Sequence, residues 1–378
     1  MTVEGGNLDA FAAICSQEPK AGDFPLARSL VKKVPIYAGP ELAERTAEED
    51  FETRLKLEWG HCLLDGPGVF VIQQSFERVE CIDAMTAIFE RIIERERREG
   101  SDRGDHFGNN IRIWNSVQKT ALEAPHLFAD YYGNPIIALA CRAWLGPHYQ
   151  LTAQVNIVQP GGKAQAAHRD YHLGFQSDET TEQYPMHAQT MTPFLTLQGA
   201  VAHSDMSIAS GPTKLLPYSQ LFAAGYRTFR NPDYVSYFDQ HSVQLELSKG
   251  DLLFFNPALF HAAGSNHTQE NRVANLLQIS SAFGRPMESV NRVAMIEKVY
   301  PELLNRIRAN ELTPRHLRDT IAAVADGYAF PTNLDTDPPL NGNAPATQAD
   351  HLQEALENQW TCAELMDVLG ERARRQQP

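Results

Sequence analysis

Residues 154–171 read QVNIVQPGGKAQAAHRDY, in which a strand-like run leads through a Pro-Gly-Gly turn to His168 and Asp170. In an extended chain, residues i and i+2 point to the same face, so this histidine and this aspartate can reach one point in space together. An imidazole and a carboxylate that converge make half of a metal site. The other half must come from elsewhere in the chain.

Short apolar runs separated by turn residues continue from this stretch to about residue 285. They read LTAQVNIVQ, FLTLQGAVAH, TKLLPYS, VQLELSKGDLLFFN and RVANLLQISSAF. Several short strands with little helical periodicity between most of them predict an antiparallel sandwich or barrel. We expect a β core at 150–285. A mostly helical region (1–149) with one leading strand near 66–76 precedes it, and a helical extension (286–378) follows.

Helix signals flank this core on both sides. Apolar residues recur at steps of three and four from Val79 to Ile92, and Gly100 follows as a stop signal. Beyond the core, Thr313 before a proline predicts a helix start, and Thr361 with Glu364 predicts a capping box. The terminal helices can support a homodimer or pack on their own barrel.

Charge and cysteine usage narrow the partners and the compartment. The 378 residues carry a net charge of −14, which disfavours a nucleic acid or an anionic membrane as partner. No apolar run approaches the roughly 20 residues that span a bilayer, and the N-terminal residues lack the pattern of a signal peptide. The five cysteines are scattered, which predicts free thiols. We expect a cytoplasmic protein.

The third metal ligand is expected from a different strand of the same barrel. A non-haem iron site uses two histidines and one carboxylate on one side of the metal. His261, in GDLLFFNPALFHAAGSN (250–266), follows a strongly apolar strand and a proline turn, so it is the best candidate. His203 with Asp205 forms a second His-x-Asp pair and is the serious rival. It ranks lower because the next histidine, His241, lies in a polar segment with no strand leading into it.

Arg272 opens the run RVANLLQIS, in which alternate residues share one face. An arginine that points into an apolar barrel is a buried charge that costs several kcal/mol unless it is paired. A bound carboxylate removes that cost through bidentate hydrogen bonds. Beside an open iron site, this arginine predicts 2-oxoglutarate, whose 2-oxo acid end chelates iron and whose distal carboxylate needs a cation.

Candidates for substrate contact lie in two places. The stretch SDRGDHFGNNIRIWNS (101–116) is rich in polar groups and reads either as a surface loop leading into a strand or as a segment that faces substrate, with Arg112 first among its residues. Around the metal pair, Arg169, Tyr171 and His172 are further candidates. Arg169 is a candidate for a substrate contact or for a specific salt bridge.

These residues resemble the phytanoyl-CoA dioxygenase family of Fe(II)/2-oxoglutarate-dependent oxygenases. The similarity covers roughly residues 66–283, and it includes the family-like pattern AHSDMSIASGPTKLLPYS (202–219). The resemblance implies a double-stranded β-helix, or jelly roll, clasped by helices. It implies that His168, Asp170 and His261 bind iron and that Arg272 binds the distal carboxylate of 2-oxoglutarate.

Two departures from the family pattern bear on the site. Ala263 stands where the family often has a serine or threonine that helps to hold the cosubstrate, so we assign the remaining cosubstrate contacts to Gln154 and Asn156. Ala200 stands where a bulky aromatic residue is common, which predicts a larger pocket. Related halogenases replace the metal-binding carboxylate with a small residue, so the intact Asp170 favours other outcomes.

The sequence therefore predicts a single catalytic domain (1–378) that uses Fe(II), 2-oxoglutarate and O2. It is expected to oxidise an unactivated C–H bond of a small-molecule metabolite, by hydroxylation or by desaturation or cyclisation, with release of succinate and CO2. No catalytic residue beyond the iron centre is expected. Two alternatives remain open: a cupin-like metal-dependent hydrolase or isomerase that does not use 2-oxoglutarate, and a non-catalytic barrel.

Overall fold

The computed structural model describes residues 7–20, 22–45, 48, 50–101, 104, 110–330, 333–340 and 343–377. Of the polar cluster in 101–116, Asp105, His106 and Asn109 lie outside the described residues.

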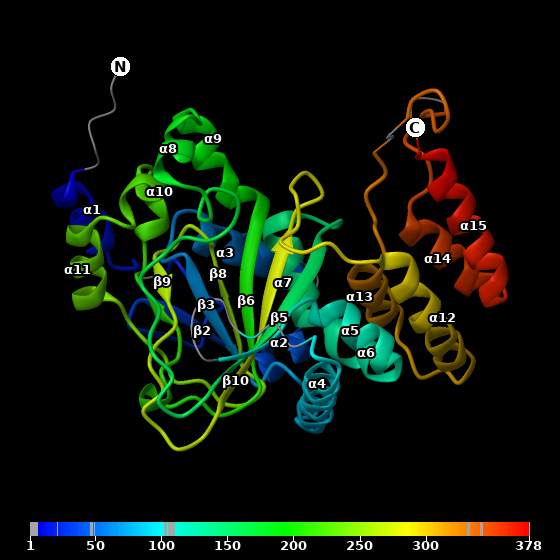
Figure 1. Ribbon diagram of the computed structural model, residues 1–378, viewed down its shortest axis with the longest axis horizontal. Coiled ribbons are helices and arrows are strands. Elements are labelled where there is room, and N and C mark those ends of the chain that lie inside the picture. Colours follow the sequence, from blue (N-terminus) through cyan, green and yellow to red (C-terminus); the bar gives the residue numbers. More distant parts are fainter. Residues whose placement is uncertain are drawn as a thin grey trace.

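A large, twisted sheet runs through the centre of the molecule (Figure 1). In spatial order its eight strands are β1 (Ser29–Val31), β2 (Val34–Ala38), β3 (Val69–Gln73), β8 (Leu252–Phe255), β6 (Thr196–Ala202), β10 (Arg272–Ser280), β5 (Gln150–Val158) and β4 (Ile111–Ile113). All neighbours are antiparallel except β2 and β3. Four of these strands come from before residue 150, so the N-terminal region and the β core share one sheet.

A second, smaller sheet consists of β7 (Lys214–Leu215) and β9 (His261–Ala262). Isolated bridges extend it, among them Met206 with Leu247 and Leu215 with Val243. A long, mostly antiparallel sheet with a short one beside it is the architecture of a double-stranded β-helix, which confirms the predicted fold class. The run 243–255 is shorter as a strand than its apolar pattern predicts, because only residues 252–255 join the large sheet.

The two faces of the large sheet bury different sets of residues, as the pleat requires. On the outer face, residues such as Val155, Leu197 and Leu277 join the main core with the helices. On the inner face, residues such as Ala200, Leu253 and Ala274 form a separate cluster toward the small sheet. The inner face is therefore the side on which a site can form.

Helices pack against the outer face of the sheet, where they share the main core with it. In chain order, the α-helices of the described chain are α1 (Leu8–Cys15), α2 (Gly39–Arg45), α3 (Phe51–Leu64), α4 (Glu80–Glu99), α5 (Ser116–Glu123), α6 (Pro125–Tyr132), α7 (Pro135–Leu145), α8 (Asp178–Glu182), α9 (Met186–Met191), α10 (Gly225–Thr228), α11 (Pro232–His241), α12 (Arg292–Arg308), α13 (Pro314–Val324), α14 (Gln348–Glu357) and α15 (Cys362–Arg375). Within the described part of the chain, none of them combines the length and the apolar character needed to cross a membrane.

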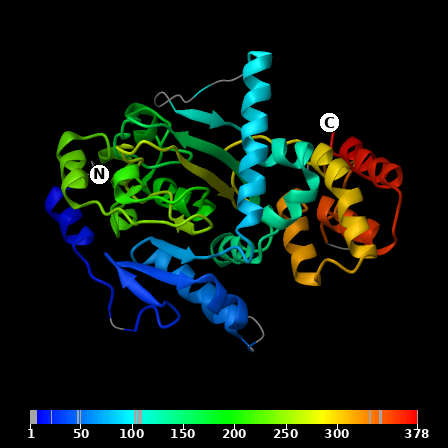
Figure 2. The ribbon, with the colours of Figure 1, turned by 90° about the horizontal axis from the view of Figure 1, so that it is seen from below.

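The long helix α4 illustrates how sequence pattern sets packing (Figure 2). Its apolar stripe, which includes Ile82, Met85, Phe89 and Ile92, is buried in the main core. Each such side chain contributes roughly 1.5–3 kcal/mol on burial. The helix ends at Gly100, whose φ of +65° is the left-handed conformation that glycine adopts without strain. The predicted helix and its stop are confirmed.

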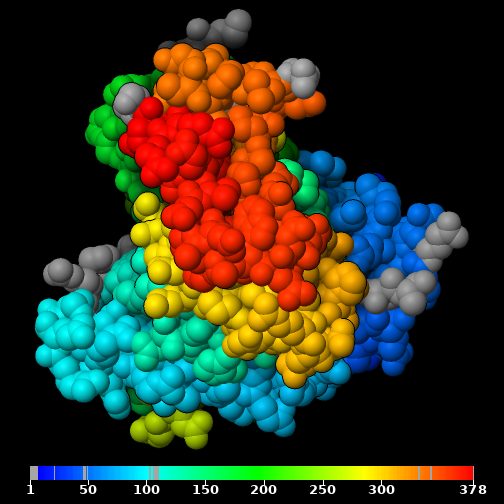
Figure 3. Space-filling view, turned by 90° about the vertical axis from the view of Figure 1, so that its right-hand side faces the viewer, coloured from blue at the N-terminus to red at the C-terminus, as the bar shows by residue number. Residues whose placement is uncertain are grey.

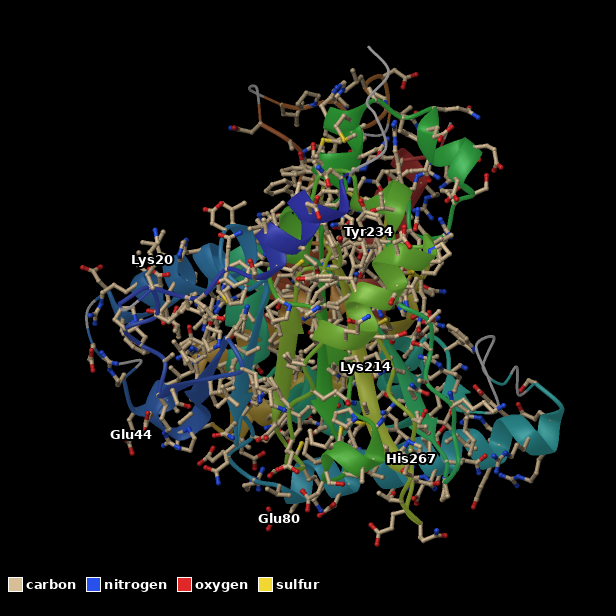
Figure 4. All side chains as sticks on the ribbon, turned by 90° about the vertical axis from the view of Figure 1, so that its left-hand side faces the viewer. Lys20, Glu44, Glu80, Lys214, Tyr234 and His267 are labelled. Carbon is tan, nitrogen blue, oxygen red and sulfur yellow. The ribbon has the colours of Figure 1, made fainter. Side chains whose placement is uncertain are left out.

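The C-terminal helices α12–α15 lie together at one end of the molecule and cover it (Figure 3). They pack on one another, and α12 and α13 also pack on α5, α6 and α7 of the same chain. The predicted N-cap Thr313 and the capping box of Thr361 and Glu364 are both present. At the opposite end, α1 packs on α11, where the ring of Phe11 lies 5.0 Å from that of Tyr234 (Figure 4).

Candidate metal centre and its cavity

The two histidines predicted to bind the metal face each other across a β-bridge. The backbone N–H of His168 donates to the carbonyl of His261 at 3.0 Å, and the N–H of His261 donates back at 3.1 Å. This exchange of bonds places their side chains next to each other, with ring centroids 4.4 Å apart. The chain around His168 forms this bridge but no regular strand, so the extended pairing is more local than the sequence predicts.

Asp170 completes a three-residue group whose ligand atoms all lie within 4.8 Å of one another. Its Oδ1 lies 3.6 Å from Nε2 of His168, and its Oδ2 lies 3.5 Å from Nε2 of His261. The backbone N–H of Asp170 donates to the carbonyl of Pro257, which ties this residue to the turn before His261. The structure thus brings together the three predicted ligands.

The hydrogen bonds of the two imidazoles fit metal binding. Nδ1 of His168 lies 2.8 Å from the carbonyl of Ala166, and Nδ1 of His261 lies 2.8 Å from the carbonyl of Leu259. A carbonyl only accepts, so each Nδ1 carries the proton and each Nε2 keeps its lone pair toward the site. Metal-binding histidines are commonly oriented in this way.

The electrostatics of the three residues also fit a divalent cation. Burial alone would raise the pKa of Asp170, but the neighbouring His168 and His261 and the hydrogen bond from Gln198 hold that pKa well below its usual range. Burial, reinforced by the neighbouring His261, lowers the pKa of His168. Two neutral imidazoles and one carboxylate are the donor set of a non-haem iron site.

Gln198 is a site residue that the sequence analysis misses. Its amide donates to Oδ2 of Asp170 and, at 3.2 Å, to Oε1 of Gln278 on the next strand. Both glutamines point inward, and they lie opposite each other in the register of β6 and β10. A glutamine inside the apolar run TLQGAVA is the signal that could have revealed it.

A cavity of about 460 Å³ opens beside the metal ligands on the inner face of the sheet. Its walls include Met206, Leu247, Leu253, Phe255 and Leu276 as apolar residues, and Arg112, Gln154, Asn156, Arg272 and Glu288 as polar ones. Phe175, whose side chain is half exposed, also lines the cavity. Ala200 also lines the cavity, and its small side chain leaves open the space that a bulky aromatic residue would fill.

Arg272 enters this cavity as a buried cation. Its Nη1 donates to the carbonyls of Ser210 at 3.3 Å and Gly264 at 3.4 Å. Burial, and then the charge of Arg112, lower the pKa of Arg272 to about 10, so the guanidinium stays protonated at neutral pH. Among the described residues, no carboxylate lies within ion-pair distance of it. This position suits a cation whose partner is an anionic ligand.

Three further predicted contact residues line the cavity on the β4–β5 side. Asn156 lies opposite both Ala274 of β10 and Arg112 of β4, and Gln154 lies opposite Leu276. All of these side chains are buried except that of Leu276, which is half-buried. Oδ1 of Asn156 makes no hydrogen bond within the described part of the chain. The guanidinium of Arg112 lies 5.5 Å from the ring of Trp114.

Arg169 does not reach the cavity, so the predicted substrate contact is replaced by a structural position. Its Nη2 donates to the carbonyls of Ser219 at 2.6 Å and Phe222 at 3.0 Å, and its guanidinium lies 5.1 Å from the rings of Tyr226 and Phe260. The predicted alternative, a salt bridge, is not formed with any described residue. Successive residues of an extended chain point to opposite faces. Arg169 therefore points outward, because His168 and Asp170 on either side of it point inward.

Tyr171 and His172 also lie outside the cavity lining. Tyr171 has a φ of +61°, which ends the extended alternation directly after Asp170 and begins a turn. Its ring is buried and its hydroxyl donates to the carbonyl of Ile279 at 3.3 Å. His172 therefore does not share a face with Asp170 as the i+2 spacing predicts.

The rival histidine, His203, belongs to the core. Its Nδ1 lies 2.8 Å from the hydroxyl of Thr86, and its Nε2 lies 2.6 Å from that of Tyr131. Both ring nitrogens are thus engaged behind the sheet, where α4 and α6 pack. Burial lowers its pKa to about 3. The lower rank given to the pair His203 and Asp205 is therefore justified by the structure.

Comparison with known proteins assigns the chain to a family. The family model for phytanoyl-CoA dioxygenase (PhyH) matches residues 64–274, which is more than half of the chain. The chain belongs to the phytanoyl-CoA dioxygenase family. The family predicted from the sequence is confirmed.

Individual relatives are more distant. The chain is 28% identical over 200 residues to dioxygenase olcK of Penicillium canescens, with 52% of this chain and 58% of olcK covered. It is 27% identical over 146 residues to the iron/alpha-ketoglutarate-dependent dioxygenase ausU of Aspergillus calidoustus, covering 37% and 42%. The crystal structure of the non-heme alpha ketoglutarate dependent carbocyclase SnoK has a TM-score of 0.44 and 18% identity, covering 61% and 86%. The chain thus spans less than two thirds of the curated relatives it matches.

Proposed function

We propose that this protein is an Fe(II)/2-oxoglutarate-dependent oxygenase that oxidises an unactivated C–H bond of a small-molecule metabolite and releases succinate and CO2. The observation that carries the proposal is one cavity that joins His168, Asp170 and His261 to the buried cation Arg272. Family membership and the iron/alpha-ketoglutarate-dependent activity named for ausU support it.

Each residue of the chain has a defined part in this proposal. His168, Asp170 and His261 would hold iron(II) on one side and leave the other positions to 2-oxoglutarate and O2. Arg272 would pair with the distal carboxylate of 2-oxoglutarate, and Gln154 and Asn156 are our candidates for its remaining contacts. When bound, iron would supply the redox chemistry by which O2 oxidises 2-oxoglutarate to succinate and CO2 and also oxidises the C–H bond of the substrate.

The protein's own residues would orient the ligands and shield the reaction. Gln198 fixes Asp170, and the backbone carbonyls behind His168 and His261 fix the two imidazoles. The apolar walls exclude water from the reacting centre. Because Asp170 is intact, hydroxylation, desaturation or cyclisation is favoured over halogenation. We propose Arg112 as a substrate contact beside Trp114.

The test is anaerobic reconstitution with Fe(II) and 2-oxoglutarate, followed by oxygen and measurement of succinate. Wild type should form succinate, and His261→Ala should lose both iron and succinate. A hydrolase or isomerase of the cupin type would bind zinc or manganese and leave 2-oxoglutarate untouched. A non-catalytic barrel would bind no iron at all. Metal analysis and the succinate assay together separate the three.

Three broader expectations accompany the proposal. All five cysteines are free thiols, and three of them are buried, which supports a reducing compartment such as the cytoplasm. A homodimer is also proposed; the helices α12 and α13, which could support it, already pack on α5, α6 and α7 of their own chain. A single catalytic domain over residues 1–378 is supported by the sheet that the two regions share.

A further inference from the structure

The loop between β10 and α12 contributes a wall of the cavity that the sequence analysis did not anticipate. Met287 and Glu288 line the cavity from this loop, which follows β10 in Figure 1. Both lie beyond residues 64–274, the part that matches the family model. Any role of Met287 and Glu288 therefore belongs to a part of this chain that the family model does not match.

Glu288 is held by one of its two carboxyl oxygens. Oε1 accepts a hydrogen bond of 2.6 Å from the backbone N–H of Asn115, the residue that precedes α5. Oε2 is buried and makes no hydrogen bond within the described residues. A buried acceptor without a partner costs roughly 1–3 kcal/mol. A ligand that donates a hydrogen bond to Oε2 would remove this cost.

The charges around Glu288 determine which kind of hydrogen-bond donor a ligand can bring to its carboxyl group. Burial raises the pKa of Glu288 to about 7, while the N–H of Asn115 and the nearby cations Lys119 and Arg112 oppose the rise. Two cations near the carboxyl disfavour an ammonium ligand, and the carboxyl disfavours a carboxylate. A neutral hydroxyl group is repelled neither by the two cations nor by the carboxyl group.

The position of Glu288 is separate from the line between the metal and Arg272. On β10, Ala274 and Leu276 occupy the inner face between Arg272 and Gln278, and Gln278 lies next to the glutamine that binds Asp170. Glu288 instead lies with Trp114 and Gln154 on the β4–β5 side. Trp114, Met287 and Phe175 add apolar surface that suits a hydrocarbon skeleton.

We propose that Glu288 is a specificity-determining residue that accepts a hydrogen bond from a hydroxyl group of a neutral, otherwise apolar substrate. This inference rests on the proposed function, because it assigns the substrate class of the same site. The observation behind it is that Oε2 of Glu288 faces an apolar cavity, while the bond from Asn115 to Oε1 fixes the orientation of the carboxyl group.

The experiment compares four head groups on one skeleton, using decahydro-2-naphthol, its methyl ether, and the carboxylate and ammonium analogues. Calorimetric titration is done anaerobically on the protein loaded with Fe(II) and 2-oxoglutarate. The titration is done at about pH 8.5, where a carboxyl with a pKa of about 7 is ionised. One hydrogen bond to this charged acceptor is worth about 1.5 kcal/mol, so wild type should bind the alcohol roughly tenfold more tightly than the ether. The alcohol should also bind more tightly than either charged analogue.

Glu288→Gln tests the residue itself. Its amide can keep the bond from Asn115 through oxygen, and it then presents N–H groups to the cavity instead of an acceptor. The preference for alcohol over ether should disappear in this variant, while its affinity for 2-oxoglutarate is kept. Glu246→Gln, an exposed position with the same chemical change, should behave as wild type.

Three results would overturn the proposal: equal binding of alcohol and ether by wild type, an unchanged preference in Glu288→Gln, or no binding of any probe. Failure of the proposed function looks different. It would show as absent Fe(II) or 2-oxoglutarate binding by wild type, which is measured before any probe is added.

Discussion

Replacing Arg272 with methionine should separate ligand binding from folding. The guanidinium is buried, its pKa is lowered to about 10, and its two hydrogen bonds to carbonyls are long. Against the ordinary value of 12.5, a shift of this size means that the charge costs the empty fold roughly 3 kcal/mol. The two lost hydrogen bonds offset about 1–2 kcal/mol of the gain. The empty variant should therefore be as stable as wild type, or slightly more stable.

The affinity for 2-oxoglutarate should change in the opposite sense. Removing one partner of a buried, bidentate charge pair costs about 2–5 kcal/mol, so the dissociation constant should rise by about 100-fold or more. In a thermal-unfolding assay with Fe(II) under anaerobic conditions, 2-oxoglutarate at about 100 times the wild-type Kd stabilises wild type by about 2.7 kcal/mol. The same concentration should stabilise the variant by about 0.4 kcal/mol.

A matched control is Arg230→Met, which removes an exposed arginine paired with Asp178. It should leave 2-oxoglutarate affinity unchanged. The reasoning is refuted if Arg272→Met lowers the stability of the empty protein by several kcal/mol and binds 2-oxoglutarate as wild type does. That result would make Arg272 a structural residue.

Three other predictions follow from the same structure. A Cβ added at Gly225 would lie 1.9 Å from Cζ of Arg169, so Gly225→Ala should destabilise the fold by about 1–3 kcal/mol in urea unfolding, whereas Gly370→Ala, with no atom within 4 Å, should not. Burial holds the pKa of His203 at about 3, so its contribution to stability is complete above about pH 6.5 and is lost as pH falls, at roughly 1.4 kcal/mol per pH unit; His203→Gln should show a shallower acid dependence of Tm and keep its iron. Burial raises the pKa of Glu288 to about 7, so its carboxyl favours folding below the unfolded pKa near 4.5 and this contribution is lost as pH rises; the Tm of Glu288→Gln should gain on that of wild type between about pH 4.5 and 7.

The convergence of the candidate metal ligands could be predicted from the sequence because its signals are local and their order is specific. A His-x-Asp pair, a histidine after an apolar strand and an arginine eleven residues later each require only strand periodicity to be placed on one face. The structure brings all four to one cavity. The helices whose caps and stop signals are written in the sequence, such as those at Gly100, Thr313 and Thr361, are also where they were predicted.

The predictions that were wrong or missing concern residues whose positions depend on backbone conformation and on long-range packing. Tyr171 and His172 leave the metal-facing side because φ of Tyr171 is positive, which no periodicity reveals for a tyrosine. Arg169 turns outward into a pocket that exists only because Gly225, far along the chain, lacks a side chain. Glu288 was missed because a short loop after β10 carries it back over the cavity, and loop paths are not encoded in hydrophobic pattern.

In the proposed function, Asp170 joins His168 and His261 in holding iron for the oxidation of 2-oxoglutarate. The most direct test of this role is iron content and succinate formation in wild type and in Asp170→Ala, with circular dichroism to confirm that both are folded. Wild type should contain iron and form succinate from 2-oxoglutarate, and the variant should lose both. A folded Asp170→Ala protein that binds iron and forms succinate as wild type does would contradict this role.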